Sequence, residues 1–181
     1  LSDALDIQKL STPFPNKQLL SKDFKYDYLS ENKQNELIFI GQVDGRAYKN
    51  RRKILKKVES FINIPFVIQN TKRKLEYYEF LNILSKYKFV LNPLGNGRSQ
   101  FLNVRYYEAI HLKCIPVQEI TKNMLQHYKE LQVLESINFF NVKDLKKVDF
   151  NSVNFKDELI KDVPLSLEKY FESVDLKNII E

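Results

Sequence analysis

The sequence predicts an α/β fold with a Rossmann-like parallel sheet and helices on both of its faces. Short apolar runs rich in branched and aromatic residues alternate with longer amphipathic segments, which is the pattern of βαβ units. The chain of 181 residues is long enough for one domain with a sizeable core. Its 43% hydrophobic and 29% charged residues are ordinary for a globular protein and exclude wholesale disorder.

Five apolar runs predict the strands of the sheet. Each is too short for a helix and rich in the residues that favour buried strands. The runs are Leu37–Ile40, Phe66–Ile68, Lys88–Leu91, Cys114–Val117 and Ile137–Phe140. Ahead of them, residues 1–35 are polar and turn-rich and predict an irregular approach or linker segment. Residues 36–181 are therefore expected to form the Rossmann-like domain.

Apolar residues at helical spacing predict the helices. Three such stripes consist of Ile54, Leu55, Val58, Phe61 and Ile62; of Leu75, Tyr78, Leu81 and Leu84; and of Leu167, Tyr170, Phe171 and Val174. Two further helices are predicted at Asn103–Leu112 and at residues 121–131. Strands that alternate with helices of this length predict a parallel sheet.

The four glycines all lie in two loops, each directly after a predicted strand and before a predicted helix. They are Gly41, Gly45, Gly95 and Gly97. Such loops meet at the carboxyl ends of the strands, where α/β sheets bind ligands. A helix that starts there offers free N–H groups to an anion. We therefore expect a phosphate-bearing ligand, although glycines that serve only as turn residues remain an alternative.

Basic residues gather beside the first glycine loop. Arg46, Arg51 and Arg52 fall near the predicted helix start, where a guanidinium fork can meet a diphosphate. Farther along the same helix, lysines 53, 56 and 57 are expected to form a solvated face. The net charge of the chain is +6.

Several kinds of site are disfavoured by what the sequence lacks. The single cysteine, Cys114, excludes an intrachain disulfide and a thiolate zinc cluster. The two histidines, His111 and His127, are 16 residues apart with no metal-ligand pattern around them. There is no G-x-G-x-x-G, no G-x-x-x-x-G-K-[ST] and no D-x-D. No cofactor and no metal are expected, and no apolar run has the roughly 20 residues of a membrane span.

One segment carries a family resemblance. Residues 86–117 read KYKFVLNPLGNGRSQFLNVRYYEAIHLKCIPV, in which Arg105, Glu108 and Ala109 form R-x-x-E-A on a predicted helix before the C-I-P-V strand. This resembles the donor-binding half of GT-B glycosyltransferases, most closely the exostosin-like families. The resemblance implies one half of a GT-B enzyme, its C-terminal nucleotide-sugar-binding domain.

The resemblance also implies roles for individual residues. The carboxylate of Glu108 would hold the ribose of the nucleotide. The side chain of Arg105 would stabilise the leaving diphosphate, helped by Arg51 or Arg52. The remaining expected contacts to the nucleotide sugar come from the two loops, at Gly41, Arg46, Asn92, Pro93, Gly95, Asn96 and Gly97. An alternative for Arg105 and Glu108, three residues apart, is an ordinary surface ion pair.

The sequence departs from the family pattern at three places. Gln100 stands where many GT-B enzymes have a second glutamate, eight positions before Glu108. Lys113 replaces the usual helix-ending glycine. The loop over residues 98–104 is about three residues longer than the commonest exostosin-like spacing.

The expected function is transfer of a sugar from a nucleoside-diphosphate sugar to a glycan or other acceptor. A second Rossmann-like domain, in cis or in trans, would supply the acceptor site, so the isolated domain could bind donor and transfer nothing. No nucleic acid partner is expected, and the location is expected to be cytoplasmic, with peripheral membrane association as a variant. One alternative is a non-catalytic basic α/β module that binds nucleic acid or another anionic partner. Another is a degenerate donor domain that serves in assembly.

Overall fold

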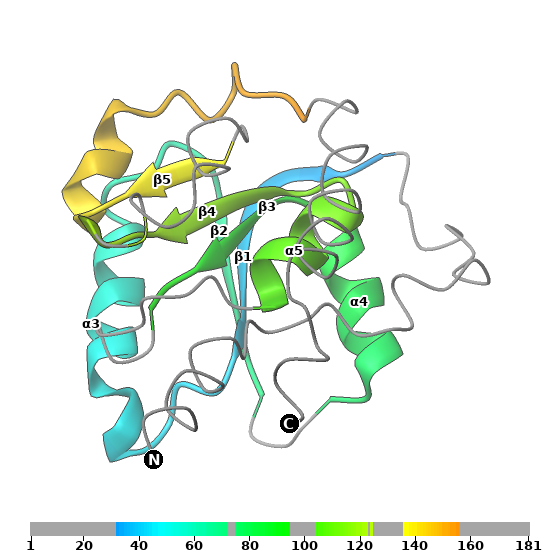
Figure 1. Cartoon of the computed structure of the whole chain (residues 1–181), viewed down its shortest axis with the longest axis horizontal. Coiled ribbons are helices and arrows are strands. Elements are labelled where there is room, and N and C mark those ends of the chain that lie inside the picture. Colours follow the sequence, from blue (N-terminus) through cyan, green and yellow to red (C-terminus); the bar gives the residue numbers. More distant parts are fainter. Residues whose placement is uncertain (1–31, 72–74, 95–103, 123, 125–135, 156–181) are drawn as a thin grey trace, which may run out of the picture.

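The computed structural model describes residues 32–71, 75–94, 104–122, 124 and 136–155, which form a five-stranded, all-parallel sheet with helices (Figure 1). The strands are β1 (Gln34–Gly41), β2 (Phe66–Asn70), β3 (Tyr87–Asn92), β4 (Ile115–Glu119) and β5 (Ile137–Phe139). Each corresponds to one predicted apolar run. The predicted α/β, Rossmann-like fold class is therefore confirmed. The first strand begins at Gln34, within the end of the segment expected to be irregular.

Helical segments connect the strands. After β1 come η2 (Arg46–Tyr48) and α3 (Lys49–Val58), and α4 (Tyr77–Ser85) lies between β2 and β3. Helix α5 (Val104–His111) joins β3 to β4, and η3 (Val142–Lys147) follows β5. Three of the predicted helices are thus confirmed. The predicted helices at 121–131 and 167–174, apart from residues 121, 122 and 124, lie outside the described residues.

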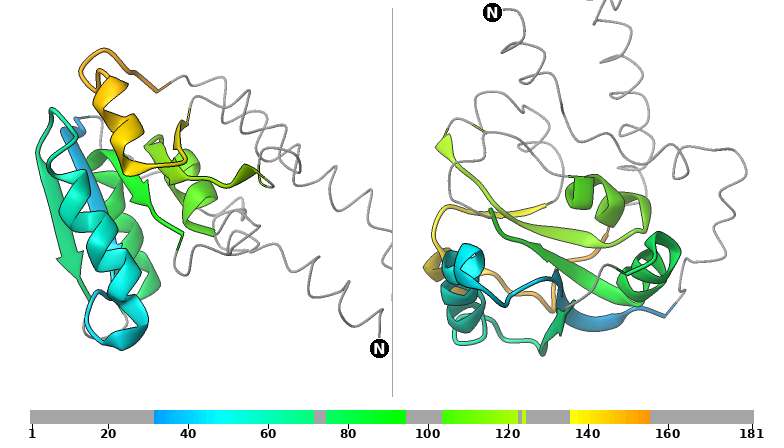
Figure 2. Two further views of the ribbon diagram at one scale, coloured as in Figure 1. Left: turned by 90° about the vertical axis from the view of Figure 1, so that its left-hand side faces the viewer. Right: turned by 90° about the horizontal axis from the view of Figure 1, so that it is seen from below.

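Alternate residues of each strand face opposite sides of the sheet, and helices cover both sides (Figure 2). On one side, Leu37 and Phe39 of β1 belong to a cluster with Leu55 and Val58 of α3. On the other side, the side chains of Ile38 and Ile40 join a cluster with Leu81 and Leu84 of α4, Ala109 of α5 and Leu112 just after α5. Because both faces are buried, the strands are continuous apolar runs rather than alternating ones.

The strand order is β2-β1-β3-β4-β5. The chain therefore moves from β1 to β2 in one direction and from β3 to β4 in the other. Such a reversal leaves a crevice between the two diverging connections, outside the carboxyl ends of β1 and β3, where open α/β sheets bind ligands. The last residues of these two strands are Gly41 and Asn92. The fold thus brings the first glycine loop close to the segment that follows β3.

Helix α5 ends with a lysine in the left-handed conformation. The backbone φ of Lys113 is 56°. The N–H of Lys113 donates to the carbonyl of Ile110 at 2.9 Å, and that of Cys114 donates to the carbonyl of Ala109 at 2.8 Å. This pair of bonds is the Schellman motif, whose left-handed residue is usually glycine. Lys113 therefore fills the position where the resemblance leads one to expect glycine, at a conformational cost.

Candidate functional site

At the end of β1, the backbone comes close to two side chains. A Cβ atom at Gly41 would lie 3.0 Å from Cζ of Phe39 and 3.7 Å from Nη1 of Arg105. The first distance is too short for an ordinary contact, so a larger residue would have to displace the buried ring of Phe39. The guanidinium of Arg105 therefore lies within ordinary contact distance of this position, beside the end of the strand.

Arg52 holds the loop that follows β1. Its Nη1 atom donates to the carbonyl oxygens of Val43 and, at 2.7 Å, of Gly45. From the neighbouring strand, the amide of Asn70 donates to Asp44 at 2.8 Å and accepts from the N–H of Val43 at 3.3 Å. The φ of Gly45 is +93°, a conformation that favours glycine. Arg52 is therefore a structural clamp of this loop.

The neighbouring residue, Arg51, turns toward the sheet. Its Nη1 atom donates to the carbonyl of Gln42 at 2.8 Å. The guanidinium carbon lies 5.5 Å from the centre of the Phe39 ring and 4.9 Å from that of Tyr48. Burial lowers the pKa of Arg51, and Tyr48 partly offsets this effect.

Arg105 reaches the same ring from the other side of the sheet. It lies in the first turn of α5, and its guanidinium carbon is 5.8 Å from the centre of the Phe39 ring and 5.4 Å from that of Phe80. Burial lowers the pKa of Arg105 most, the charge of Glu108 raises it, and the charge of Arg51 lowers it. Two arginines from helices on opposite faces thus meet at the carboxyl end of β1.

Both arginines carry a buried donor without a partner. Among the residues that the structure describes, the Nε atoms of Arg51 and Arg105 are buried and donate no hydrogen bond. Buried polar groups are rarely left unpaired, because losing water without a replacement is costly. Two like charges held close together and partly out of water are also unfavourable. An anion at this position would relieve both costs.

Glu108 lies one helical turn from Arg105. The residue is only 5% exposed, and its charge acts on the guanidinium of Arg105. The alternative of a solvent-exposed surface ion pair is therefore wrong. A buried carboxylate beside a buried guanidinium is a strongly coupled pair. A carboxylate on α5 one turn from Arg105 can accept hydrogen bonds from hydroxyl groups.

Two buried polar side chains, those of Asn92 and Gln118, join the ends of β3 and β4. Asn92 and Gln118 are opposite each other in the register, and the amide of Asn92 donates to the side-chain oxygen of Gln118. In the next residue, Glu119, Oε2 accepts the N–H of Leu94 at 2.7 Å. Burial raises the pKa of Glu119, and the bond from Leu94 opposes this shift. These contacts fix the segment that leaves β3.

Sequence reasoning did not single out Gln118 and Glu119. The available signal was the change from the apolar run Cys114–Val117 to two polar residues at the carboxyl end of a strand. Asn92 was expected to contact a ligand, and the structure shows its amide bonded to Gln118. The side chain of Asn92 therefore has a structural task in this arrangement.

The other expected site residues are spread more widely. Arg46 is exposed on η2, and Pro93 is buried directly after β3. Gly95, Asn96, Gly97 and His127 lie outside the described residues, as does the side chain of His111. The lysines at 53, 56 and 57 are exposed, as predicted. Within the described ranges there is no group of three or more His, Cys, Asp or Glu side chains placed to hold a metal ion.

Comparisons with known proteins found no matching family model, no matching curated protein and no matching solved structure. In the part of the chain that the structure describes, none of the helices has both the length and the apolar character to cross a membrane.

Proposed function

We propose that this domain binds the nucleoside diphosphate of a sugar nucleotide and is the donor-binding half of a glycosyltransferase of the exostosin-like kind. The observation that carries the proposal is the meeting of Arg51 and Arg105 over Phe39, with a buried, unpaired Nε atom on each. The pair lies where the two connections of the sheet diverge. Its charge, burial and place all favour a multiply charged anion.

A diphosphate suits this pair better than a single carboxylate does. Each guanidinium presents several N–H groups in a fixed plane and forms strong, charge-assisted bonds to phosphate oxygens. Two guanidinium groups from different helices can bind two neighbouring phosphates. Arg51 is the candidate from α3, because it shares the Phe39 ring with Arg105 and keeps an unpaired Nε atom, whereas Arg52 is bonded to two carbonyls of the loop.

The same arrangement would assist sugar transfer. When the bond between sugar and phosphate breaks, the leaving diphosphate gains negative charge. Cationic groups that are already in place stabilise that charge without reorganising. In this proposal Arg51 and Arg105 supply the stabilisation that a metal ion supplies elsewhere. The acceptor, a glycan or a related hydroxyl compound, would be presented by a second Rossmann-like domain in cis or in trans.

Glu108 is proposed to hold the ribose. Its carboxylate, one helical turn from Arg105, can accept hydrogen bonds from the two ribose hydroxyls. With the carboxylate engaged by the ribose, the guanidinium of Arg105 would remain available to the diphosphate. This division of tasks predicts that the affinity for the nucleotide depends on the hydroxyl groups of its ribose.

The first test is a calorimetric titration of the protein with UDP, GDP, ADP and CDP. We expect selective binding of one of the four. The second part compares that ribonucleotide with its 2′-deoxy analogue. Glu108→Gln should weaken binding of the ribonucleotide by about tenfold or more, because bonds to a charged acceptor are lost. It should change binding of the deoxy analogue much less.

Two results would overturn the proposal. One is failure of all four nucleotides to bind a protein that circular dichroism shows to be folded. The other is an equal loss of both analogues in Glu108→Gln, which would mean that the carboxylate acts on the fold rather than on the ribose. Glu36→Gln is the matched control, since Glu36 is a carboxylate near the opposite end of β1.

A further inference from the structure

Positive charge is concentrated on two neighbouring helices. Helices α3 and η3 hold nine basic residues and one acidic residue: Lys49, Arg51, Arg52, Lys53, Lys56, Lys57, Lys143, Asp144, Lys146 and Lys147. Their net charge of +8 exceeds the +6 of the whole chain, so all other residues together are slightly negative. A charge asymmetry of this size creates a directed field around the molecule.

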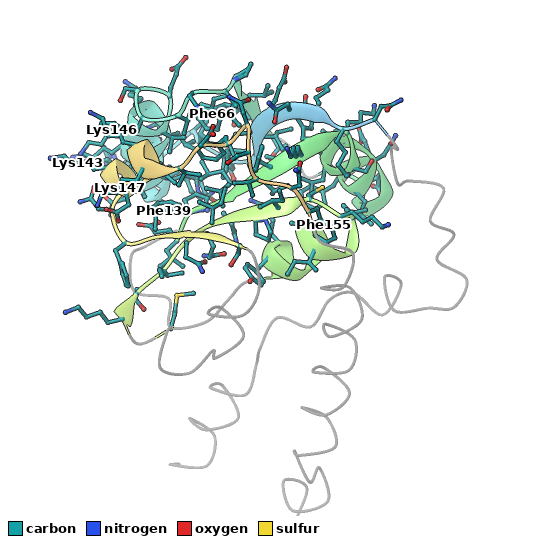
Figure 3. All side chains as sticks on the ribbon, turned by 90° about the horizontal axis from the view of Figure 1, so that it is seen from above. Phe66, Phe139, Lys143, Lys146, Lys147 and Phe155 are labelled. Atoms are coloured by element: carbon teal, nitrogen blue, oxygen red, sulfur yellow. The ribbon has the colours of Figure 1, made fainter. Side chains whose placement is uncertain are left out.

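Six of these lysines form one exposed surface, which we call the lysine surface: Lys53, Lys56, Lys57, Lys143, Lys146 and Lys147. Helices α3 and η3 are in contact. The Nζ atom of Lys146 lies 4.9 Å from the centre of the Phe61 ring, just beyond the end of α3. Figure 3 shows the side chains of Lys143, Lys146 and Lys147 extending outward from η3.

The acidic residue within the lysine surface is already engaged. The Oδ2 atom of Asp144 accepts the N–H of Phe140 at 3.2 Å and that of Asn141 at 2.9 Å, and so caps η3. Farther along, Asp149 accepts from the N–H of Asn151 at 3.2 Å. The exposed residue Glu59 follows α3. Among the described residues, these carboxylates leave most of the charge of the lysine surface uncompensated.

An exposed aromatic side chain borders the lysine surface. Phe140 is 53% exposed, and Ile68 is the other large hydrophobic residue found exposed in the described part of the chain. The backbone N–H of Phe140 donates to Asp144, which holds Phe140 beside the start of η3. A solvent-exposed phenyl ring beside lysines combines the two forces that attach peripheral proteins to membranes.

We propose that the lysine surface binds a bilayer that contains acidic phospholipids. Lysine ammonium groups on long stems suit a diffuse, mobile layer of negative charge, and Phe140 can enter the boundary of the acyl chains. A nucleic acid would be better served by exposed arginine forks and stacked aromatics. Here Arg51 and Arg52 instead contact their own loop.

Membrane binding at this surface would leave the carboxyl ends of β1 and β3 open, since Phe140 follows β5 at the edge of the sheet. Arg51 lies in the first turn of α3, whereas Lys56 and Lys57 lie in its last turn. The two cationic regions are thus near opposite ends of the helix. The proposal goes beyond donor binding and does not depend on it, so the two can fail separately.

The test is sedimentation of the full chain with vesicles of phosphatidylcholine, with and without phosphatidylglycerol. We expect binding to the acidic vesicles that weakens as salt is raised. Lys143→Gln/Lys147→Gln should weaken binding to the acidic vesicles by about tenfold or more, since each lysine close to an acidic membrane contributes to the binding free energy. Phe140→Ser should remove the part of the binding that resists salt.

The matched control is Lys86→Gln/Lys122→Gln, which removes two charges from exposed lysines outside α3 and η3. It should change vesicle binding by less than about twofold. Three outcomes would overturn the proposal: equal binding to neutral vesicles, an equal loss in the control, or displacement of the protein from vesicles by a short RNA that binds more tightly. The last would assign the lysine surface to nucleic acid.

Discussion

The two ends of α3 carry the same sign of charge in different settings. At the start of the helix, Arg51 and Arg52 are partly buried and directed at the loop and the sheet. In its last turn, Lys56 and Lys57 are exposed to solvent. Burial is costly for a charge unless a partner offsets it, whereas solvation costs little. Placement, rather than the number of charges, thus separates the proposed ligand site from the lysine surface.

Arginine and lysine are also suited to these different tasks. A guanidinium is weakly hydrated and can be packed against rings, as Arg51 and Arg105 are against Phe39. An ammonium group is strongly hydrated and remains in solvent at the end of its stem. The chain therefore uses arginine where a fixed, directional cation is needed and lysine where a diffuse field suffices.

The largest expected effect is on nucleotide binding. Arg105→Met and Arg51→Met should each weaken binding of the preferred nucleoside diphosphate by roughly 10- to 100-fold, because each removes charge-assisted hydrogen bonds. Lys53→Met, on the same helix as Arg51, should have little effect on binding of the nucleoside diphosphate. Calorimetric titration measures all three. If Lys53→Met is as harmful as Arg51→Met, the exposed lysines and the partly buried arginines of α3 do not differ in the way described.

The next effect is on stability and should differ between the adjacent residues Arg51 and Arg52. Arg52→Met should lower the free energy of unfolding by about 1–3 kcal/mol, since the carbonyls of Val43 and Gly45 lose a charged donor. Arg51→Met should lower it less, because Nη1 of Arg51 makes one bond, to the carbonyl of Gln42, and a methionine side chain can keep the contact with the rings of Phe39 and Tyr48. Urea denaturation of both variants provides the measurement. Equal losses of stability would mean that Arg51 is a structural clamp as well.

Lys113 destabilises the folded state through its backbone conformation and not through its charge. Lys113→Gly should raise the free energy of unfolding by about 1 kcal/mol, because glycine adopts a positive φ without the steric penalty of a Cβ atom. Lys86→Gly is the control, since the φ of Lys86 is −77°, and there the substitution should destabilise. Thermal denaturation would contradict the Schellman assignment if Lys113→Gly were less stable than the parent.

The smallest effect concerns Glu119, the carboxylate at the same edge of the sheet. Because burial raises its pKa in the folded protein, the folded state binds the proton more tightly than the unfolded state does. Stability should therefore fall as the pH rises through the interval between the unfolded and the folded pKa. Glu119→Gln keeps an acceptor for the N–H of Leu94 and should be slightly more stable than the parent at neutral pH.

The check for Glu119 is urea denaturation across acidic and neutral pH. The advantage of Glu119→Gln should vanish below the ordinary pKa of a glutamate, where both proteins carry a neutral side chain. A variant that is less stable than the parent at every pH would show that the negative charge itself stabilises the segment after β3.

The strands and the region of the site could be predicted from the sequence, but the contacts within it could not. Runs such as Leu37–Ile40 indicate buried strands without reference to the rest of the chain. Glycines after two strands indicated the edge at which ligands bind. Which of Arg51 and Arg52 faces the sheet depends on the rotation of α3, which the packing of Leu55 and Val58 sets.

The contacts of the polar residues at the ends of β3 and β4 could not be predicted from the sequence either. Asn92 was a reasonable ligand contact by position, yet its partner is Gln118, 26 residues later in the chain. Such pairing depends on strand register, which follows from the whole sheet rather than from a local pattern. Glu108 was proposed as a candidate from the family resemblance and from its spacing from Arg105, and its burial became evident only in three dimensions.

The central claim is that Arg51 and Arg105 together form a diphosphate site. The most direct measurement is calorimetric titration of Arg51→Met/Arg105→Met, beside the parent protein, with the preferred nucleoside diphosphate and with the corresponding nucleoside. The account predicts that affinity for the diphosphate falls to the level of the nucleoside, while affinity for the nucleoside is unchanged. Equal losses for the two ligands, or undiminished binding of the diphosphate, would contradict it.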